Sequence, residues 1–259
     1  METFLLFLVV GVVAQSVDGA LGMAYGVISS SVLLAFGVPP AMASASVHGA
    51  EVFTTAASAG SHVAHRNVDW RLLVPLAIAG VIGGCLGAYV LAGIDGDVIK
   101  PFIIAYLAGM GVYILWRAGH DIAPRYIRSW MVAPLGLVGG VLDAIGGGGW
   151  GPTVSSTLVG AGQEPRRAIG TVNTAEFFLT VAISATFVWA LLSGHWAEAG
   201  ALENHAAAIG GLVVGGLVAA PFAGVITKRV PRRILTYAVG GLLLLVAGFQ
   251  GLQLAGVFA

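Results

Sequence analysis

Charged side chains are scarce in this sequence. They make up 9% of its 259 residues, whereas a soluble domain carries about a quarter. Hydrophobic residues account for 58%, and the mean hydropathy is +0.93. This composition excludes water as the main solvent and predicts an all-α membrane protein whose surroundings are a lipid bilayer.

Other features are missing as well. The single cysteine, Cys85, excludes an internal disulfide and disfavours a thiolate metal site. The amino terminus lacks the basic residues of a secretory signal, so we expect its apolar segment to be retained. No nucleotide-binding loop, His-Glu-x-x-His motif or Ser/His/Asp set is visible. We therefore expect no cofactor, metal, nucleic-acid partner or enzymatic activity, and the sequence leaves the oligomeric state open.

Apolar segments divide the chain. Six of them have about 20 or more residues, enough to cross a core of about 30 Å as helices. These predicted spans are 40–64, 71–93, 98–117, 167–192, 204–227 and 233–256. Two longer segments, 4–36 and 130–162, are interrupted by glycine and a carboxylate, and each predicts two arms of about 14 residues. A re-entrant hairpin is the preferred interpretation, and two short tilted crossings are the alternative.

Basic residues orient this topology, because they prefer cytoplasmic loops. With the amino terminus outside, eleven of the twelve lysines and arginines fall at cytoplasmic ends. Lys100 alone lies outside. The chain is thus expected to be a multi-pass membrane protein with both termini outside.

A constant interval relates the two halves. Asp18 precedes Asp143 by 125 positions, and Glu51 precedes Glu176 by the same number. Since the two hairpins enter from opposite sides, the interval predicts an inverted repeat. Residues 1–117 form its first half, 118–129 a cytoplasmic linker and 130–259 its second half. Further pairs are Gly22/Gly147, Tyr25/Trp150, Gly26/Gly151, Ser30/Ser155, Ser31/Ser156, His48/Asn173 and Thr55/Thr180, and at an interval of 131 Gly80/Gly211, Gly84/Gly215 and Tyr106/Tyr237.

These patterns resemble a known family. Each half has a turn region followed by a serine-bearing half-helix and a Gly-x-x-Pro entry, and 60–71 reads GSHVAHRNVDWR. Together they are similar to the sulfite exporter TauE/SafE family of bacterial inner-membrane permeases. The resemblance implies export of small sulfur-containing anions, sulfite or organosulfonates such as sulfoacetate. One departure is that residues 146–149 are all glycine, whereas 21–25 read LGMAY, so the two half-sites are expected to differ.

The turns are the predicted substrate site. Half-helix N-termini at a broken helix offer N–H groups to anions, and glycine permits close approach. The candidates are Gly22, Met23, Ala24, Tyr25, Gly26, Gly147, Gly148, Gly149, Trp150 and Gly151. No lysine or arginine is predicted in the membrane core, so neutral donors would assist: Ser46, His48, Thr171, Asn173 and Thr174. Packing is the alternative role for Tyr25 and Trp150.

The buried carboxylates have two interpretations each. Glu51 and Glu176 follow Pro40 and Pro165 by eleven residues, which places them roughly 16 Å deep, near the midplane. They could exchange protons during transport or hydrogen-bond between helices. Asp18 and Asp143 could accept N–H bonds and hold the turns, or coordinate a ligand or ion.

Three classes of function fit such a chain to different degrees. A secondary transporter working by alternating access, with proton coupling as an option, is preferred. An uncoupled anion channel or an importer of a related organic anion is the alternative. An intramembrane enzyme is disfavoured, because catalysis does not require a duplicated, inverted site.

Overall fold

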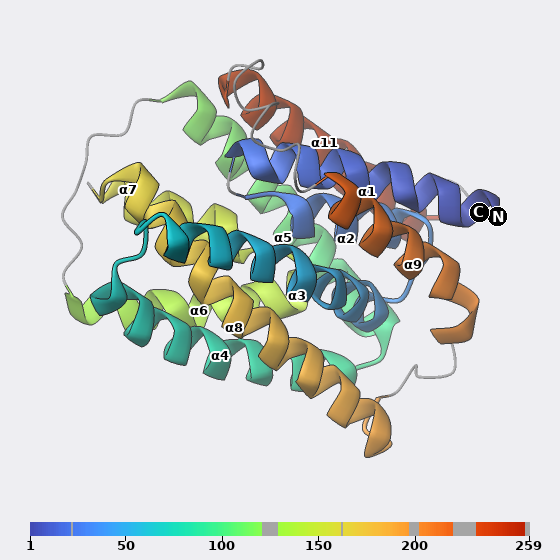
Figure 1. The fold of residues 1–259 in the computed structure, drawn as a ribbon. Helices are drawn as coiled ribbons and strands as arrows, with labels where there is room; N and C mark the ends of the chain where they lie inside the picture. The colour runs from blue at the N-terminus through green and yellow to red at the C-terminus, as the bar shows by residue number, and fades with distance from the viewer. Residues whose placement is uncertain (22, 121–128, 162, 197–201, 220–231, 257–259) are drawn as a thin grey trace.

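The computed structural model describes residues 1–21, 23–120, 129–161, 163–196, 202–219 and 232–256. These residues form an all-helical protein, without a strand in the described ranges (Figure 1). The first half contains α1 (Glu2–Leu21), α2 (Tyr25–Ala35), α3 (Pro40–Ala64), α4 (Trp70–Ala92) and α5 (Gly96–Gly119). The second contains α6 (Val132–Gly146), α7 (Ser156–Gly160), α8 (Pro165–Leu192), α9 (Leu202–Ala219) and α11 (Arg232–Leu254). A 3₁₀ turn at Ser129–Met131 precedes α6, and a π-helical turn at Gly151–Ser155 runs into α7.

Local chemistry sets the helix starts. Proline occupies the first turn of α3 and of α8, where its missing N–H has no cost. Asp69 caps α4 by accepting a hydrogen bond from Arg71 N at 3.0 Å, and Asp95 caps α5 through Asp97 N at 2.8 Å. The cap at Asp69 gives a structural role to part of the 60–71 stretch.

Four described helices are long and apolar enough to cross a membrane: 70–92, 96–119, 166–192 and 236–254. They match four of the six predicted spans. α3 has the predicted bounds and 25 residues, but its serines, threonines, His48 and Glu51 make it more polar. α9 is described only to Ala219, and the rest of the predicted 204–227 span lies outside the described residues. Both crossings therefore stay predictions.

The two interrupted segments have unequal arms. In the first, α1 has 20 residues and α2 has 11. In the second, α6 has 15 residues, and the π-helical turn and α7 have five each. The breaks fall where glycine and carboxylate predicted them, but the expectation of two equal arms was wrong. The reason is that each carboxylate lies within the first arm, before the turn, instead of at the turn itself.

Helices from opposite halves pack closely. α1 lies against α9, and α6 against α4 (Figure 1). The glycines at these contacts leave no room for a side chain: a Cβ on Gly211 would lie 2.9 Å from Leu8 N, and one on Gly140 2.9 Å from Gly84 N. Gly84 and Gly211 therefore lie at close contacts between helices, a common place for small residues in membrane proteins.

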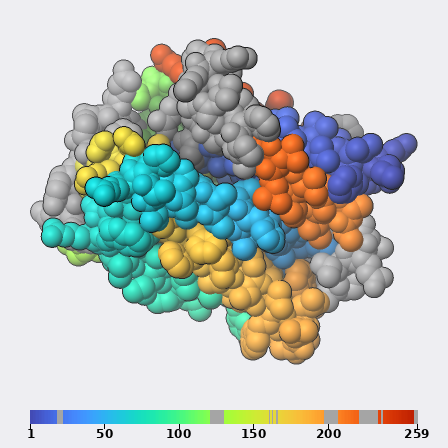
Figure 2. Space-filling model, viewed as in Figure 1, coloured from blue at the N-terminus to red at the C-terminus, as the bar shows by residue number. Residues whose placement is uncertain are grey.

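The outer surface is apolar. On α4, Val74, Ile78, Ile82 and Leu86 recur every fourth position and are each at least half exposed. Such a stripe on one helix face fits contact with lipid. Figure 2 shows another face, where α3 and α8 lie side by side. Both predicted midplane glutamates are on this helix pair.

Candidate functional site

The two breaks meet inside the protein. A Cβ on Gly26 would lie 2.7 Å from Gly148 Cα and 2.8 Å from Gly147 O, so only glycine allows this backbone contact. Gly147 and Gly148 have φ of +66° and +147°, a region that favours glycine. Residues of the two turns, although far apart in sequence, thus form one centre.

Asp143 organises the second break. Its Oδ1 accepts hydrogen bonds from Gly149 N at 2.7 Å and Trp150 N at 2.9 Å, and the residue is 1% exposed. Its Oδ2 lies 3.1 Å from His48 Nε2. The sequence left open whether Asp143 holds the turn or coordinates a ligand. In the structure it accepts the N–H bonds of the turn and also contacts His48.

The His48–Asp143 contact joins α3 to the second break. His48 Nδ1 lies 2.8 Å from Ser44 O, a carbonyl that can only accept, so Nδ1 is the donor there. The bond between Nε2 and Asp143 Oδ2 then needs one further proton, carried by either the imidazole or the carboxyl. Ser44 also donates to Ala144 O at 2.5 Å, which ties α3 to the end of α6.

Asp18 holds the first break less tightly. Its Oδ1 accepts a hydrogen bond from Tyr25 N at 3.2 Å, the backbone N–H of Ala24 also points to this carboxylate, and the residue is half-buried. The aromatic side chains after the two breaks are both anchored: Tyr25 donates to Leu212 O and Trp150 Nε1 to Val172 O, each at 3.1 Å. Both also pack closely, Trp150 against Gly80 and Tyr25 against Gly216.

These contacts change the interpretation of the half-helix N-termini. The N–H groups of Tyr25, Gly149 and Trp150 were predicted to be available to an anion, but carboxylates already accept from them. An anion at these three groups must therefore replace a carboxylate. Gly22 lies outside the described residues. Met23 and Ala24 link α1 to α2, and Ala24 has the strained φ of +147°.

Glu51 and Glu176 lie near the same centre. Glu51 is 5% exposed, and its Oε2 has no hydrogen-bond partner among the described residues. Its Oε1 would lie 2.8 Å from a Cβ on Gly26. Glu51 is within electrostatic range of Asp143, Glu176 and Asp18, and Glu176 is within range of both aspartates.

The neutral donors are mostly engaged elsewhere. Ser46 donates to Met42 O at 2.5 Å and Thr174 to Gly170 O at 2.7 Å, each within its own helix. Thr171 Oγ1 accepts from Asp69 N, and Asn173 donates to Ser58 Oγ at 3.1 Å. Of the five predicted donors, His48 is the one that hydrogen-bonds to a break residue within the described part of the chain.

Sequence reasoning missed Tyr106. Its ring packs on the second break, with Cδ1 2.9 Å from a Cβ placed on Gly146 and Cζ 3.3 Å from one on Gly149. Its hydroxyl is buried without a partner among the described residues. The Tyr106/Tyr237 pairing was visible in sequence but was used only as a sign of duplication.

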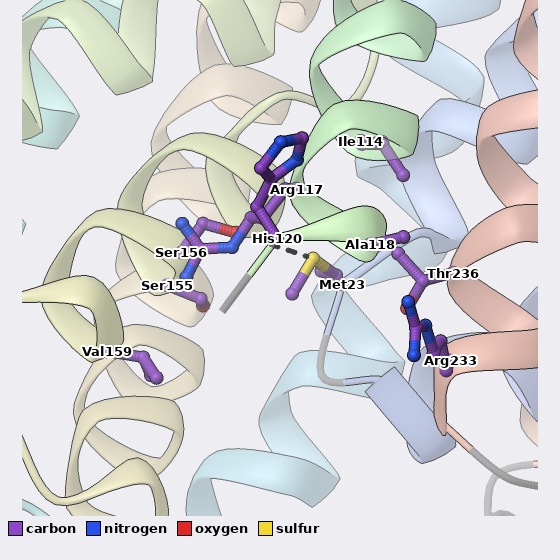
Figure 3. Close-up of a pocket in the computed structure, with 10 residues that line it drawn as sticks. All are labelled: Met23, Ile114, Arg117, Ala118, His120, Ser155, Ser156, Val159, Arg233 and Thr236. Carbon is purple, nitrogen blue, oxygen red and sulfur yellow. Dashed lines mark hydrogen bonds between the residues drawn. The ribbon is translucent and has the colours of Figure 1, made fainter. Parts of the chain in front are cut away.

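A cavity of about 340 Å³ was also missed. Its lining residues come from the first break, the second arm and the ends of α5 and α11, and include Met23, Ser155, Arg117 and Arg233 (Figure 3). In sequence the arginines served only to orient the chain. For metal binding, no group of three His, Cys, Asp or Glu side chains within the described ranges is arranged to hold an ion.

Comparison with known proteins agrees with this architecture. The sulfite exporter TauE/SafE family matches residues 7–249. A curated relative, the probable membrane transporter protein YtnM of Bacillus subtilis (strain 168), is 41% identical over 253 residues, which covers 95% of this chain and 82% of the relative. No solved structure matches the chain significantly. The family match and the relative each extend over nearly the whole chain, which therefore belongs to the sulfite exporter TauE/SafE family.

Proposed function

We propose that this protein exports small sulfur-containing anions, sulfite or organosulfonates, across the bacterial inner membrane. The observation that carries the proposal is the meeting of two broken helices at Gly26 and Gly148 beside buried ionisable side chains. Broken helices that meet near the midplane are a common way to build a transporter site. The family description supports the sulfur-containing substrate, and the relative is named a probable membrane transporter.

Contacts between counterpart residues support an inverted repeat of 1–117 and 130–259. Thr55 Oγ1 lies 3.3 Å from Thr180 Oγ1, 125 positions away. A residue approaches its own counterpart when a twofold axis passes between them. The bonds from Tyr25 N to Asp18 and from Trp150 N to Asp143 also each span seven positions. Rocking of the halves about this axis would expose the centre to alternate sides.

The membrane potential and protons can both drive export. An interior-negative potential favours anion exit by about 2.3 kcal/mol per charge per 100 mV. A proton on Glu51 or Glu176 would reduce the negative charge of the centre while the anion is bound. The His48–Asp143 contact places a further pair of ionisable side chains at the second break.

Reconstitution in liposomes tests the function. Purified protein is assayed for transport of sulfite, sulfate, taurine and sulfoacetate at two pH values. Saturable transport of a sulfur oxyanion is expected, and no transport of any of the four would refute the proposal. Channel-like flux that never concentrates the anion against its gradient would favour the uncoupled alternative.

Two variants test the coupling separately. Glu51→Gln and Glu176→Gln remove the titrating groups and keep their size. We expect at least one to abolish the pH dependence of transport. Asp97→Asn, an exposed carboxylate at the start of α5, is the matched control. If both glutamine variants keep the pH dependence of the original protein, the glutamates do not carry the coupling proton.

A further inference from the structure

The cavity lies between the centre and the ends of two helices. Arg117 is in the last turn of α5, and Arg233 is in the first turn of α11. Both ends belong to the predicted cytoplasmic side. The inner wall is formed by Met23 of the first break and by Ser155 and Ser156 of the second arm. The full lining is Met23, Ile114, Arg117, Ala118, His120, Ser155, Ser156, Val159, Arg233 and Thr236 (Figure 3).

Within the described part of the chain, no carboxylate forms an ion pair with Arg117 or Arg233. Arg117 Nη1 donates to Tyr113 OH at 3.4 Å, and the Arg233 guanidinium lies 5.9 Å from the centre of the Tyr237 ring. The ion pairs among the described residues are His48–Asp143 and Arg167–Glu164, and neither includes Arg117 or Arg233. Two guanidinium groups that face one cavity without a carboxylate in its lining select for anions.

Ser155 gives an independent indication of a ligand. It is 1% exposed, lines the cavity, and its hydroxyl has no hydrogen-bond partner among the described residues. A buried hydroxyl without a partner costs free energy, so a bound acceptor there would be stabilising. Ser156 contributes a second hydroxyl, whose present contact is a weak one of 3.9 Å to Met23 Sδ. Oxyanion oxygens accept from both types of group.

We propose that this cavity is the cytoplasmic loading site for the anion. Arg117 and Arg233 attract a sulfonate or sulfite, and Ser155 binds it before it reaches the breaks. Ile114, Val159 and Ala118 give the wall an apolar part suited to the short carbon chain of an organosulfonate. The inference rests on the proposed export function and adds where the substrate enters.

The loading site is one-sided. At the interval of 131, the counterpart of Arg117 is Gly248 and that of Arg233 is Phe102, neither of which is charged. An inverted repeat would place these counterparts toward the opposite face. The two arginines of the cavity therefore lack charged counterparts at the equivalent positions, as expected for a protein that collects an anion inside and releases it outside.

Charge-selective labelling tests the field in the cavity. In a Cys85→Ala background the chain has no cysteine, so Val159→Cys places one thiol in the lining. We compare its reaction rates with the anionic 2-sulfonatoethyl and the cationic trimethylammonioethyl methanethiosulfonates. Arg117→Gln together with Arg233→Gln should lower the anionic-to-cationic rate ratio about fivefold to tenfold. An unchanged ratio would refute the proposal.

Two controls make the labelling specific. Arg71→Gln removes one arginine from the same predicted face but not from the cavity lining, and should leave the ratio unchanged. Arg117→Lys with Arg233→Lys retains the positive charge and should keep most of the selectivity, so it also serves if the glutamine variants fold poorly. An equal fall in Arg71→Gln would mean that the general surface charge sets the ratio.

Sided transport separates this inference from the proposed function. The liposomes are sorted so that the protein has one orientation in the membrane. The KM for sulfite or sulfoacetate added at the Arg117 side should then rise about fivefold to tenfold in the double glutamine variant, with kcat nearly retained. If the original protein transports neither anion, the proposed function fails. If it transports them and the variant has an unchanged KM at that side, only the loading site fails.

Discussion

The second break is held more firmly than the first. Asp143 accepts two backbone N–H bonds and contacts His48, and it is fully buried. Asp18 accepts a longer N–H bond from Tyr25 and interacts with the N–H of Ala24, but within the described residues it has no histidine contact, and it is half-buried. The position equivalent to His48 is Asn173, which donates to Ser58 Oγ instead of approaching Asp18. The two breaks, which the proposed repeat would make equivalent, thus differ in the contacts that their aspartates make.

This difference assigns different tasks to the two breaks. The loosely held break contributes Met23 to the arginine-lined cavity, where a substrate would arrive. A segment with few hydrogen bonds is the one that opens at low free-energy cost. We therefore expect the first break to move during transport while the second serves as a fixed support.

Replacing each aspartate should give the largest difference in stability between the two breaks. Asp143→Ala leaves two N–H groups and His48 without their partner, and we expect a loss of about 3 kcal/mol or more in unfolding free energy. Asp18→Ala removes weaker backbone bonds from a half-buried group and leaves no histidine unpaired, so a smaller loss of about 1 to 2 kcal/mol is expected. Denaturant unfolding in detergent, followed by circular dichroism, measures both.

The asparagine variants serve as controls for this pair. Asp143→Asn keeps an oxygen for Gly149 N and Trp150 N, so it should be less destabilising than Asp143→Ala. Equal losses for Asp143→Ala and Asp18→Ala would show that the two breaks are equally supported, against the comparison drawn from their hydrogen bonds.

Backbone conformation should give the next largest contrast. Gly148→Ala adds a Cβ where the Gly26 and Val27 backbone lies, at a φ of +147°, and about 2 to 4 kcal/mol of destabilisation is expected. Ala24 has the same φ with a side chain present, so Ala24→Gly should stabilise by up to about 1 kcal/mol. Thermal unfolding in detergent is the measurement. Stabilisation by Gly148→Ala, or a large loss from Ala24→Gly, would contradict this contrast.

Local signals in the sequence predicted much of this framework. Proline predicted the start of α3 at Pro40, and its predicted bounds of 40–64 match the helix. The glycine run and Asp143 predicted the second break, because a left-handed backbone needs glycine and its open N–H groups need an acceptor. Such features depend on neighbours within a few residues, which is why one sequence suffices to find them.

Long-range partners could not be predicted in the same way. His48 and Asp143 are 95 positions apart, and their contact depends on how α3 and α6 are rotated about their axes. In the same way, the rotation of α8 directs Asn173 to Ser58 and Thr171 to Asp69, away from the breaks. Arg117 and Arg233 likewise share a cavity only because α5 and α11 pack together.

The smallest expected effect concerns the contact between counterparts in the two halves. Thr55 and Thr180 hydroxyls lie 3.3 Å apart, while each also donates to a carbonyl of its own helix, Glu51 O and Phe177 O. Since the mutual bond competes with these, a double-mutant cycle of Thr55→Val and Thr180→Val should give a coupling of about 0.5 kcal/mol.

A matched cycle shows whether that coupling is specific. Thr174 donates its hydrogen bond to Gly170 O within α8 instead of to Thr55. The changes in unfolding free energy caused by Thr55→Val and Thr174→Val should therefore be additive. Equal couplings in the two cycles would mean that the hydroxyls of Thr55 and Thr180 do not interact. The proposed twofold axis would then lose its most direct contact, although the two breaks would still differ in their hydrogen bonds.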